Sequence, residues 1–401
     1  MSHRLLIASA SYLVLSGCAY FQFDTEAETR LDPAPAAMGE PGPAPDNVAD
    51  ALAPYYAQLD VAHPRAPATR PEPSLDSVLT RIAFGSCHRP DRDMAILDVI
   101  VDEEPDIFIY GGDNVYGDVW SWNADLPELR DAYQQLADSP EFGRLRATTP
   151  MLAIWDDHDY GMNDLGRNFP YKGFAETLFL DFWGADEDDV RRSRPGIYDS
   201  RIYGPDGQRT QIILLDTRYF RSDLTQTPER GAAGMERYIP SQADDQDMLG
   251  DAQWAWLEEQ FRQPADLRLL VSTIQVHADG HGWEAWRTLP RERQRLYDLI
   301  DSTDAEGVIL VSGDRHSSGL YVRDDVIDYP LYEITSSSLN MSFADENNEA
   351  GPHRIGEMYA PVNYGVVGVD WEQGVVSLEI KDGEGQTVRD VTVSLSALTV
   401  E

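Results

Sequence analysis

Short apolar runs alternate with amphipathic stretches through the middle of the chain. Runs at 82–84, 107–110 and 152–155 are too short for helices and are followed by polar residues, which favours buried strands. Stretches at 91–102 and 126–136 show the spacing of amphipathic helices instead. Strands that alternate with helices predict an α/β core. The alternation continues with predicted strands at 212–215, 269–271 and 308–311, and with predicted helices at 252–261 and 291–300.

Past residue 329 the pattern changes to strands, at 331–334, 366–369, 375–380 and 388–393. The sequence therefore predicts one folded domain over residues 76–400 with a strand-rich C-terminal part.

The N-terminal segment has the pattern of an export signal. Arg4 is followed by a short apolar region at 5–15, too short to span a bilayer, and Leu15-Ser16-Gly17-Cys18 is similar to a bacterial lipobox. We expect a lipoprotein signal peptide at 1–18 and lipidation of Cys18, with an ordinary secretory signal as the alternative. Ala19 after the cysteine favours the outer over the inner membrane of the bacterial cell envelope.

Residues 19–75 form a region rich in proline and alanine. Ten of the 25 prolines lie between Pro33 and Pro73, and hydrophobic periodicity is absent. This composition predicts an extended tether between the lipid anchor and the domain. Within it, Tyr55 and Tyr56 could pack on the domain as a short helix.

The net charge and the cysteine content limit the classes of binding partner that the chain can have. The net charge of −38 over 401 residues repels polyanions, so no nucleic-acid partner is expected. Cys18 and Cys87 are the two cysteines, so a lipidated Cys18 leaves Cys87 as a free thiol that is either buried or bound to something. The oligomeric state is not fixed by these features.

Four predicted core strands end in loops rich in metal-ligating residue types. Because ligands bind outside the carboxyl ends of strands in α/β sheets, these loops are expected to converge. They are Gly85-Ser86-Cys87-His88, Gly111-Gly112-Asp113-Asn114-Val115-Tyr116, Trp155-Asp156-Asp157-His158-Asp159-Tyr160 and Ser312-Gly313-Asp314-Arg315-His316.

The mixture of donors indicates two unlike metals. A thiolate and a phenolate beside carboxylates favour a strongly Lewis-acidic ion such as Fe³⁺, whereas carboxylate oxygens favour Ca²⁺, Mg²⁺ or Mn²⁺. Two such ions a few ångströms apart are suited to activating a water and holding a phosphoryl group during in-line displacement.

The order of these four motifs resembles the alkaline phosphatase D (PhoD-like) branch of the calcineurin-like metallophosphoesterases, over about residues 82–364. The resemblance implies a β-sandwich flanked by helices (α/β/β/α), a dinuclear metal centre, and phosphomonoesterase or phosphodiesterase activity. Many relatives carry an additional N-terminal sandwich domain, and here the proline-rich region stands in its place.

Site roles follow from the resemblance, motif by motif. Asp113 is similar to the carboxylate that bridges both metals, and Cys87 and Tyr116 to ligands of the ferric ion. Asp157 is similar to a ligand of the second metal, and His158 to the histidine that assists the leaving group. The last motif supplies Asp314 and His316 as further ligands, and either Gln275 or His277 could hold the fourth motif position.

Other residues beside the motifs are candidates of a weaker kind. Asn114 and Asp156 could contact metal or substrate, although Asp156 and Asp159 could equally support the ligands. Arg89 and Arg315 could bind a phosphate oxygen. Residues 216–221 contain two arginines, for which a structural salt bridge is favoured over a phosphate site, and His277 and His281 are more often core histidines than ligands.

The sequence therefore predicts a lipid-anchored hydrolase of phosphate esters that uses a metal-bridging hydroxide. One alternative is a phosphodiesterase that acts on phospholipid or another envelope polymer. A different alternative is a non-catalytic lipoprotein that binds metals.

Overall fold

The computed structural model describes residues 48–343 and 351–400. The predicted signal peptide, Cys18 and the first part of the predicted tether lie outside these residues. No helix within the described ranges has the length and apolar character needed to cross a membrane.

The core consists of two β-sheets. In the first, β1, β2 and β3 run parallel, and β11, β12 and β13 continue the sheet antiparallel beyond β1, in the order β13-β12-β11-β1-β2-β3. The strands span Arg81–Gly85 (β1), Ile107–Gly111 (β2), Met151–Ile154 (β3), Asn363–Asp370 (β11), Val375–Asp382 (β12) and Thr387–Ser394 (β13).

The second sheet has the order β10-β8-β9-β7-β6-β5-β4, and β5, β6, β7 and β9 are parallel. Every residue of β5, β6 and β7 is buried, as expected for strands that are covered on both faces. The strands span Asp199–Tyr203 (β4), Thr210–Leu214 (β5), Leu267–Val271 (β6), Val308–Ser312 (β7), Ser318–Arg323 (β8), Leu331–Thr335 (β9) and Arg354–Tyr359 (β10).

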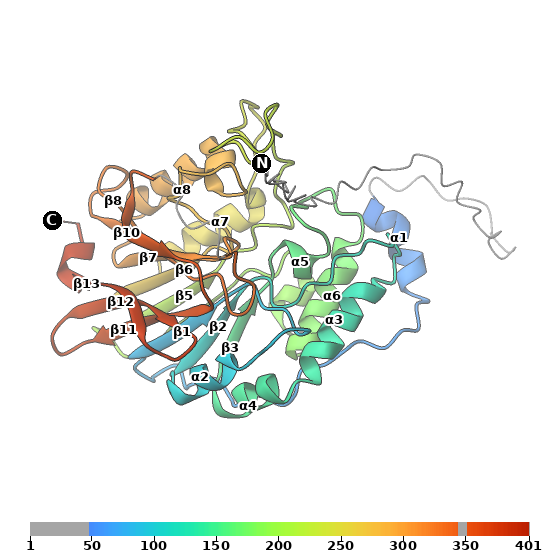
Figure 1. The fold of residues 1–401 in the computed structure, drawn as a ribbon, viewed down its shortest axis with the longest axis horizontal. Coiled ribbons are helices and arrows are strands. Elements are labelled where there is room, and N and C mark those ends of the chain that lie inside the picture. Colours follow the sequence, from blue (N-terminus) through green and yellow to red (C-terminus); the bar gives the residue numbers. More distant parts are fainter. Residues whose placement is uncertain (1–47, 344–350, 401) are drawn as a thin grey trace, which may run out of the picture. The chain divides into compact units, whose positions relative to one another are not determined.

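Helices flank the two sheets. Figure 1 shows α2 and α4 beside the first sheet, α7 and α8 beside the second, and both sheets between them. This arrangement confirms the predicted α/β/β/α sandwich with a strand-rich C-terminal part. The helices span Val48–Tyr56 (α1), Ile96–Asp102 (α2), Pro127–Ala137 (α3), Pro140–Thr148 (α4), Asp157–Tyr160 (α5), Lys172–Trp183 (α6), Gly250–Phe261 (α7) and Pro290–Ser302 (α8).

The helix predicted at 91–102 begins later than expected, at Ile96. The Asp93 side chain accepts a hydrogen bond from the backbone N–H of Ala95 at 2.9 Å, so the preceding residues form a turn. Several elements had no counterpart among the predicted helices and strands, namely α4, α5, α6, β4, β8 and β10.

The segment before residue 76 packs on the domain from residue 48 onward. Helix α1 places Tyr56 on Phe174 of α6, with 4.8 Å between stacked rings. The following chain continues along the same helix, since His63 contacts Asp181 at 2.6 Å. The folded part therefore extends into the predicted tether, and the expected contact of the Tyr55-Tyr56 pair is present as a helix.

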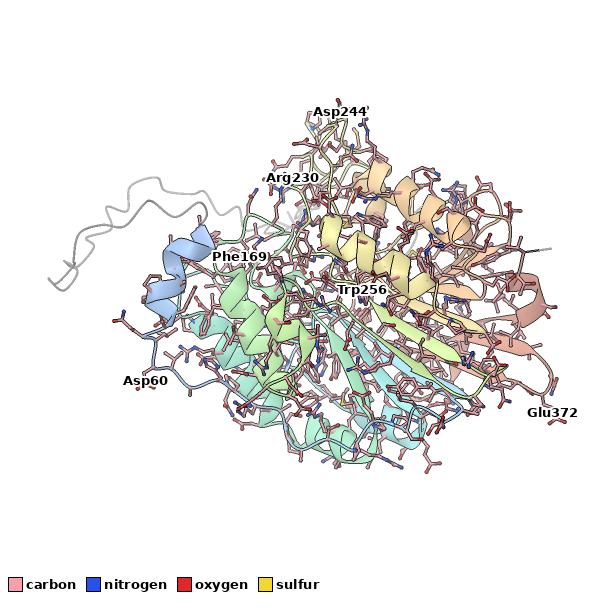
Figure 2. The ribbon with its side chains drawn as sticks, turned by 180° about the vertical axis from the view of Figure 1, so that it is seen from behind. Asp60, Phe169, Arg230, Asp244, Trp256 and Glu372 are labelled. Carbon is pink, nitrogen blue, oxygen red and sulfur yellow. The ribbon has the colours of Figure 1, made fainter. Side chains whose placement is uncertain are left out.

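A long loop region connects β5 to α7 over residues 215–249. Figure 2 shows its outer portion, with Arg230 and Asp244 labelled, projecting beyond α7 and α8. The same loop brings Arg237 to the wall of the pocket described below.

Candidate metal centre and pocket

Loops at the carboxyl ends of strands from both sheets meet at one place. The loops after β1, β2 and β3 come from the first sheet and the loop after β7 from the second. The backbone N–H of His88 donates to the carbonyl of Asp113 at 2.9 Å, which joins the first two loops. Gly112 has a φ of +99°, and a Cβ there would lie 2.6 Å from Cβ of Asp156, so glycine permits the close approach of the second and third loops. The predicted convergence is thus present.

The backbone is strained at four of the six residues predicted to bind metal. Cys87, Asp113, Asp314 and His316 have φ values of 57°, 49°, 59° and 54°, in the left-handed region that L side chains rarely adopt. Each such residue costs about 1–3 kcal/mol, and strain of this kind gathers at functional sites.

Two groups of predicted ligand atoms lie beneath the pocket and share Asp113, as does a third group in which Asp113 lies near Asp157 and His158. One atom from each of Cys87, Asp113 and His316 lies within 4.8 Å of the other two. The same holds for the four carboxylates of Asp113, Asp156, Asp157 and Asp314. Asp113 is fully buried and common to both groups, so it occupies the centre of the cluster.

Tyr116 joins the first group through its hydroxyl. The hydroxyl donates to Oδ2 of Asp113 at 3.2 Å and lies 3.2 Å from Nε2 of His316. The Cys87 thiol is 3.5 Å from the same carboxylate oxygen. A thiol, a phenol and an imidazole therefore surround one side of Asp113, and carboxylates surround the other.

The protein alone leaves this cluster short of positive charge. Burial raises the pKa of Asp113 well above its usual range, and the neighbouring Asp157 raises it further. Burial likewise raises the pKa of Asp314 and of Tyr116, and it raises the pKa of the Cys87 thiol to about 12. Anionic ligands packed this closely are stabilised by bound cations, which replace the protons.

Buried oxygen atoms without partners also fit bound cations. Oδ2 of Asp156 and Oδ1 of Asn114 accept no hydrogen bond from any described residue. Such groups are rare in protein interiors and call for a specific explanation. The donor set on one side suits a strongly Lewis-acidic ion and the carboxylates on the other suit a harder divalent one.

His158 lies beside the cluster and is held by a residue that sequence reasoning missed. Its Nδ1 is 2.7 Å from Oδ2 of Asp118, and Oδ1 of Asp118 accepts the backbone N–H of Asn163 at 2.8 Å. Because Nδ1 is paired with Asp118, Nε2 is the ring nitrogen of His158 that remains for a ligand in the pocket. Burial lowers the pKa of His158, but Asp157 and Asp118 outweigh burial and raise the pKa to about 9. The available signal was the position of Asp118 in the same loop as Asp113, five residues later.

Asp157 differs from the other carboxylates because it carries a negative charge in the absence of metal. Burial raises its pKa, but the positive charges of His158 and Arg218 outweigh burial and place the pKa below its usual value. Its Oδ2 accepts the backbone N–H of Asp164 at 2.6 Å.

Asp156 and Asp159 hold the loops together. They form a reciprocal capping box at the start of α5. Asp159 also accepts the backbone N–H groups of Asp113 and Asn114, each at 3.2 Å. Asp156 accepts the Thr273 hydroxyl at 2.6 Å, and one of its oxygens belongs to the carboxylate group described above.

Arg218 and Arg221 form buried salt bridges, the arrangement that the sequence favoured over a phosphate site. Arg218 pairs with Asp156 and Glu284, and Arg221 pairs with Glu284 at 2.8 Å. Glu284 also lines the pocket, together with its neighbour Trp283.

Gln275 and His277 lie in the core instead of at the cluster. The Gln275 amide donates to Tyr321 and Thr335 at 3.0 Å each. The ring nitrogens of His277 lie 3.0 Å from the hydroxyl of Tyr297 and 3.0 Å from a backbone carbonyl. Neither side chain belongs to the ligand groups found among the described residues, so the structure brings neither into the predicted fourth motif position.

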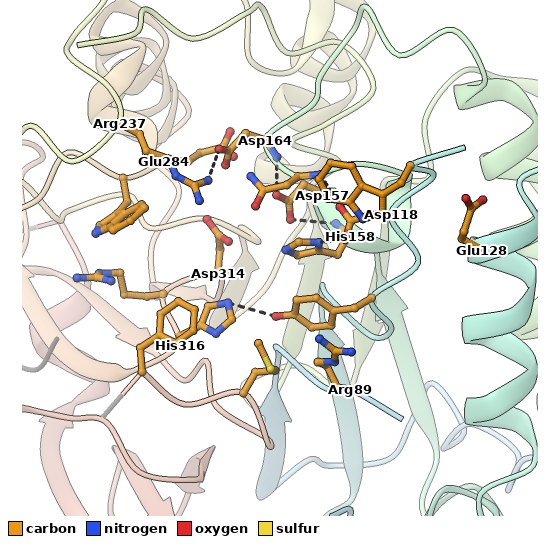
Figure 3. A pocket seen from close by; sticks show the side chains of 17 residues that line it. Arg89, Asp118, Glu128, Asp157, His158, Asp164, Arg237, Glu284, Asp314 and His316 are labelled. Atoms are coloured by element: carbon orange, nitrogen blue, oxygen red, sulfur yellow. Dashed lines mark hydrogen bonds and ion pairs between the residues drawn. The ribbon is translucent and has the colours of Figure 1, made fainter. Parts of the chain in front are cut away.

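A pocket of about 550 Å³ opens above the cluster. Its walls carry Arg89, Arg237 and Arg315, which gives an otherwise acidic site cationic groups at its margin. Arg89 is paired with Asp91, and Arg237 with Asp164 at 2.6 Å. Figure 3 shows Asp157, His158, Asp314 and His316 directed into one space, with Arg89 and Arg237 on opposite sides of it. Such a site can hold a small anion between cations and a protonated imidazole.

Comparisons with known proteins agree with this arrangement. Residues 187–386 match a family model described as PhoD-like phosphatase. Alkaline phosphatase D of Bacillus subtilis (strain 168) is 24% identical over 311 residues, which cover 67% of this chain and 52% of that protein. The chain therefore spans about half the length of this curated relative.

Two solved structures are similar in fold. One, described as "Structure of PhoD", matches with a TM-score of 0.61 at 16% identity, over 82% of this chain and 75% of that chain. The other, described as "GAP50 the anchor in the inner membrane complex of Plasmodium", has a TM-score of 0.51 at 13% identity, over 81% of this chain and 90% of that chain. At these identities the likeness shows a shared fold.

Proposed function

We propose that the chain is a PhoD-like phosphatase, and thus a metal-dependent hydrolase of phosphate esters, because residues 187–386 match that family and alkaline phosphatase D of Bacillus subtilis is a relative. The observation that carries the proposal is the pair of ligand groups that share the buried Asp113 beneath a pocket edged by arginines. A site for an anion next to a site for cations is what hydrolysis of a phosphate ester requires.

Two cations would be held on the two sides of Asp113. Cys87, Tyr116 and His316 would bind the more Lewis-acidic ion, for which we propose Fe³⁺. Carboxylates would bind the harder ion, Ca²⁺ or alternatively Mg²⁺ or Mn²⁺: Asp113, Asp157 and Asp314, with Asp156 beside them. Bound there, such a metal pair would make a nearby water more acidic, and so a better nucleophile, and would neutralise charge on the phosphoryl group.

The residues of the chain would carry out the remaining tasks. Arg89 and Arg315 at the pocket wall orient the phosphoryl oxygens, for which guanidinium groups are suited. As the bond between phosphorus and the leaving oxygen breaks, that oxygen takes a proton from Nε2 of His158. The attacking water supplies the new P–O bond, and the proton that it loses passes to solvent.

Metal analysis combined with two substrates tests the proposal. We expect purified protein to contain a transition metal and to hydrolyse bis-p-nitrophenyl phosphate, p-nitrophenyl phosphate or both, and we expect chelation to abolish the activity. Preference for the diester would favour the phosphodiesterase alternative, which includes phospholipid and envelope polymers as substrates. Protein without metal, or activity that survives chelation, would contradict the proposal.

A non-catalytic metal-binding lipoprotein predicts a different outcome. Metal would then raise the thermal stability without any turnover, and His158→Ala would leave every measured rate unchanged. Hydrolysis by the wild type that is lost in His158→Ala, with metal content retained, excludes this alternative.

The location at the cell envelope is a separate proposal, supported by the motif that ends in Cys18. We propose that a lipid on Cys18 anchors the protein to the outer membrane, and we favour this membrane over the inner one. Growth with a labelled fatty acid should label the wild type and not Cys18→Ser. Equal labelling of both proteins, or release of the wild type by high salt without detergent, would exclude the anchor.

A further inference from the structure

One wall of the pocket carries an exposed indole that the chemistry above does not use. Trp120 is 69% exposed and lines the pocket, two residues after the Asp118 that holds His158. Trp122 on the same loop is 51% exposed but is not part of the pocket lining. The two tryptophans thus differ mainly in where they lie relative to the site.

The loop that presents Trp120 is fixed by hydrogen bonds. The backbone N–H of Val119 donates to the carbonyl of Gly161 at 2.8 Å. Glu128 of α3 accepts both the backbone N–H and the hydroxyl of Ser121, at 2.9 and 3.0 Å. The carbonyl of Trp122 accepts the Tyr171 hydroxyl at 2.6 Å. The loop that carries the indole is therefore held in place, although exposing the indole forgoes the stabilisation that burial would give.

The other aromatic rings of the pocket already have partners. The Arg237 guanidinium lies 4.9 Å from the ring of Trp283. Phe343 is stacked on His316, with 4.1 Å between ring centroids, and Tyr116 lies 4.2 Å from the ring of His158. Across residues 48–343 and 351–400, no ring or guanidinium is stacked on Trp120. Among the described residues, its face is therefore available to a ligand.

We propose that Trp120 stacks on a planar ring carried by the leaving alcohol, so that the preferred substrates are phosphate esters of aryl or other ring-bearing alcohols. This inference rests on the proposed function, in which His158 protonates the leaving oxygen. Trp120 and His158 line the same pocket, and Trp120 follows by two residues the Asp118 that holds His158, so we infer that the indole borders the path of the leaving group. A flat ring there gains the offset stacking that aromatic pairs prefer.

The charge around the loop argues against a membrane surface as the partner of this indole. Asp118, Asp125 and Glu128 belong to the same loop or border it, and the whole chain carries a net charge of −38. Anionic lipid headgroups would repel such a surface. A neutral or anionic ligand that enters between Arg89 and Arg315 avoids this cost.

Binding of two non-hydrolysable phosphonates to metal-loaded protein tests the proposal by calorimetry. We expect the wild type to bind phenylphosphonate more tightly than methylphosphonate. Trp120→Ala should weaken phenylphosphonate binding roughly three- to tenfold and change methylphosphonate binding by less than about twofold. Trp120→Phe keeps a ring and should keep most of the preference, and Trp122→Ala is the matched control that should change neither affinity.

The outcomes separate the subsite from the catalytic function. Equal effects of Trp120→Ala on both phosphonates, an equal effect of Trp122→Ala, or no phenyl preference in the wild type would each overturn the proposal. Loss of vesicle binding in both tryptophan variants, without change in phosphonate affinity, would assign the loop to a membrane surface instead. A phenyl preference that depends on Trp120, in a protein that hydrolyses no ester, would refute the proposed function and retain the subsite.

Discussion

At the scale of single residues, Asp113 is the most informative position, because both ligand groups depend on it. Asp113→Asn should lose at least one bound metal, and hydrolysis should fall by more than about a hundredfold, beyond the 10- to 100-fold typical of supporting residues. Metal content and kcat/KM measure the two effects. The metal-free variant should be no less stable than the metal-free wild type, since a buried carboxyl among carboxylates has been removed.

The matched control is Asp131→Asn, which removes an exposed carboxylate from α3. It should retain full metal content and activity. If Asp113→Asn binds as much metal as this control, Asp113 does not bridge the two groups.

Asp118 offers a second test at the residue scale. Asp118→Asn keeps the shape of the side chain but removes the charge that holds His158 through its Nδ1. We expect kcat to fall roughly 10- to 100-fold with little change in KM, and to fall more for esters with poor leaving groups, because these depend most on the proton donor. A loss that is the same for good and poor leaving groups would reduce Asp118 to a structural role.

At the scale of elements, the sequence predicted those helices and strands that the hydrophobic pattern determines. The core strands β1, β2, β5, β6 and β7 are short apolar runs, and their loops converge because parallel strands end at the same edge. Elements that the pattern missed have ambiguous composition. Helix α6 is apolar on most sides, and β4 contains Asp199 and Arg201 because it lies at a sheet edge.

The site residues divide in the same way, into those with a local sequence signal and those without one. Strand-end motifs located Cys87, Asp113 and Asp314, since each is a ligand type directly after a strand. Partners that come from distant segments, such as Glu284 beside Arg218, have no local signal and required the three-dimensional structure. Either Gln275 or His277 was predicted for the fourth motif position, but hydrogen bonds hold both side chains in the core.

A buried clamp between elements gives a prediction about pH. Lys381 of β12 and Tyr364 of β11 donate to one oxygen of Glu103 at the end of α2, at 2.6 and 2.9 Å. Burial raises the pKa of Glu103, but the hydrogen bonds from Lys381 and Tyr364, together with the charges of Lys381 and Arg81, outweigh burial and lower the pKa below its usual value. Because the folded-state pKa is lowered, the clamp stabilises the fold above the unfolded pKa, and this stability is lost as pH falls through the folded value.

Lys381→Met should therefore reduce the free energy of unfolding by about 1–3 kcal/mol at pH 7. Urea unfolding from pH 7 to pH 3 should show this difference shrinking in acid, as the pH falls below the pKa of an unfolded glutamate and through the lowered folded pKa of Glu103. The control is Lys172→Met at the other lysine, which donates to the backbone carbonyls of Arg167 and Tyr219, so its effect should not vanish in acid. A constant effect of Lys381→Met across this range would show that Glu103 does not titrate with the clamp.

At the scale of the whole molecule, the ligand groups connect the two sheets of the sandwich. Cys87, Asp113 and Asp157 follow strands of the first sheet, whereas Asp314 and His316 follow β7 of the second. Bound cations would offset both the repulsion among the buried carboxylates and the strained backbone at four of these residues. The stability of the described domain should therefore depend on metal.

Chelation should lower the melting temperature of the described domain in a single transition. A cation present at a hundredfold its Kd contributes about 2.7 kcal/mol to the folded state, and chelation removes this contribution. Differential scanning calorimetry before and after EDTA, followed by return of Fe³⁺ and Ca²⁺, measures the change. Asp113→Asn, which has already lost its central ligand, should respond much less to EDTA than the wild type does. An equal response of the two proteins would mean that the stabilising cation binds at ligands other than Asp113, such as the neighbouring group of Asp157, Asp164 and Glu284.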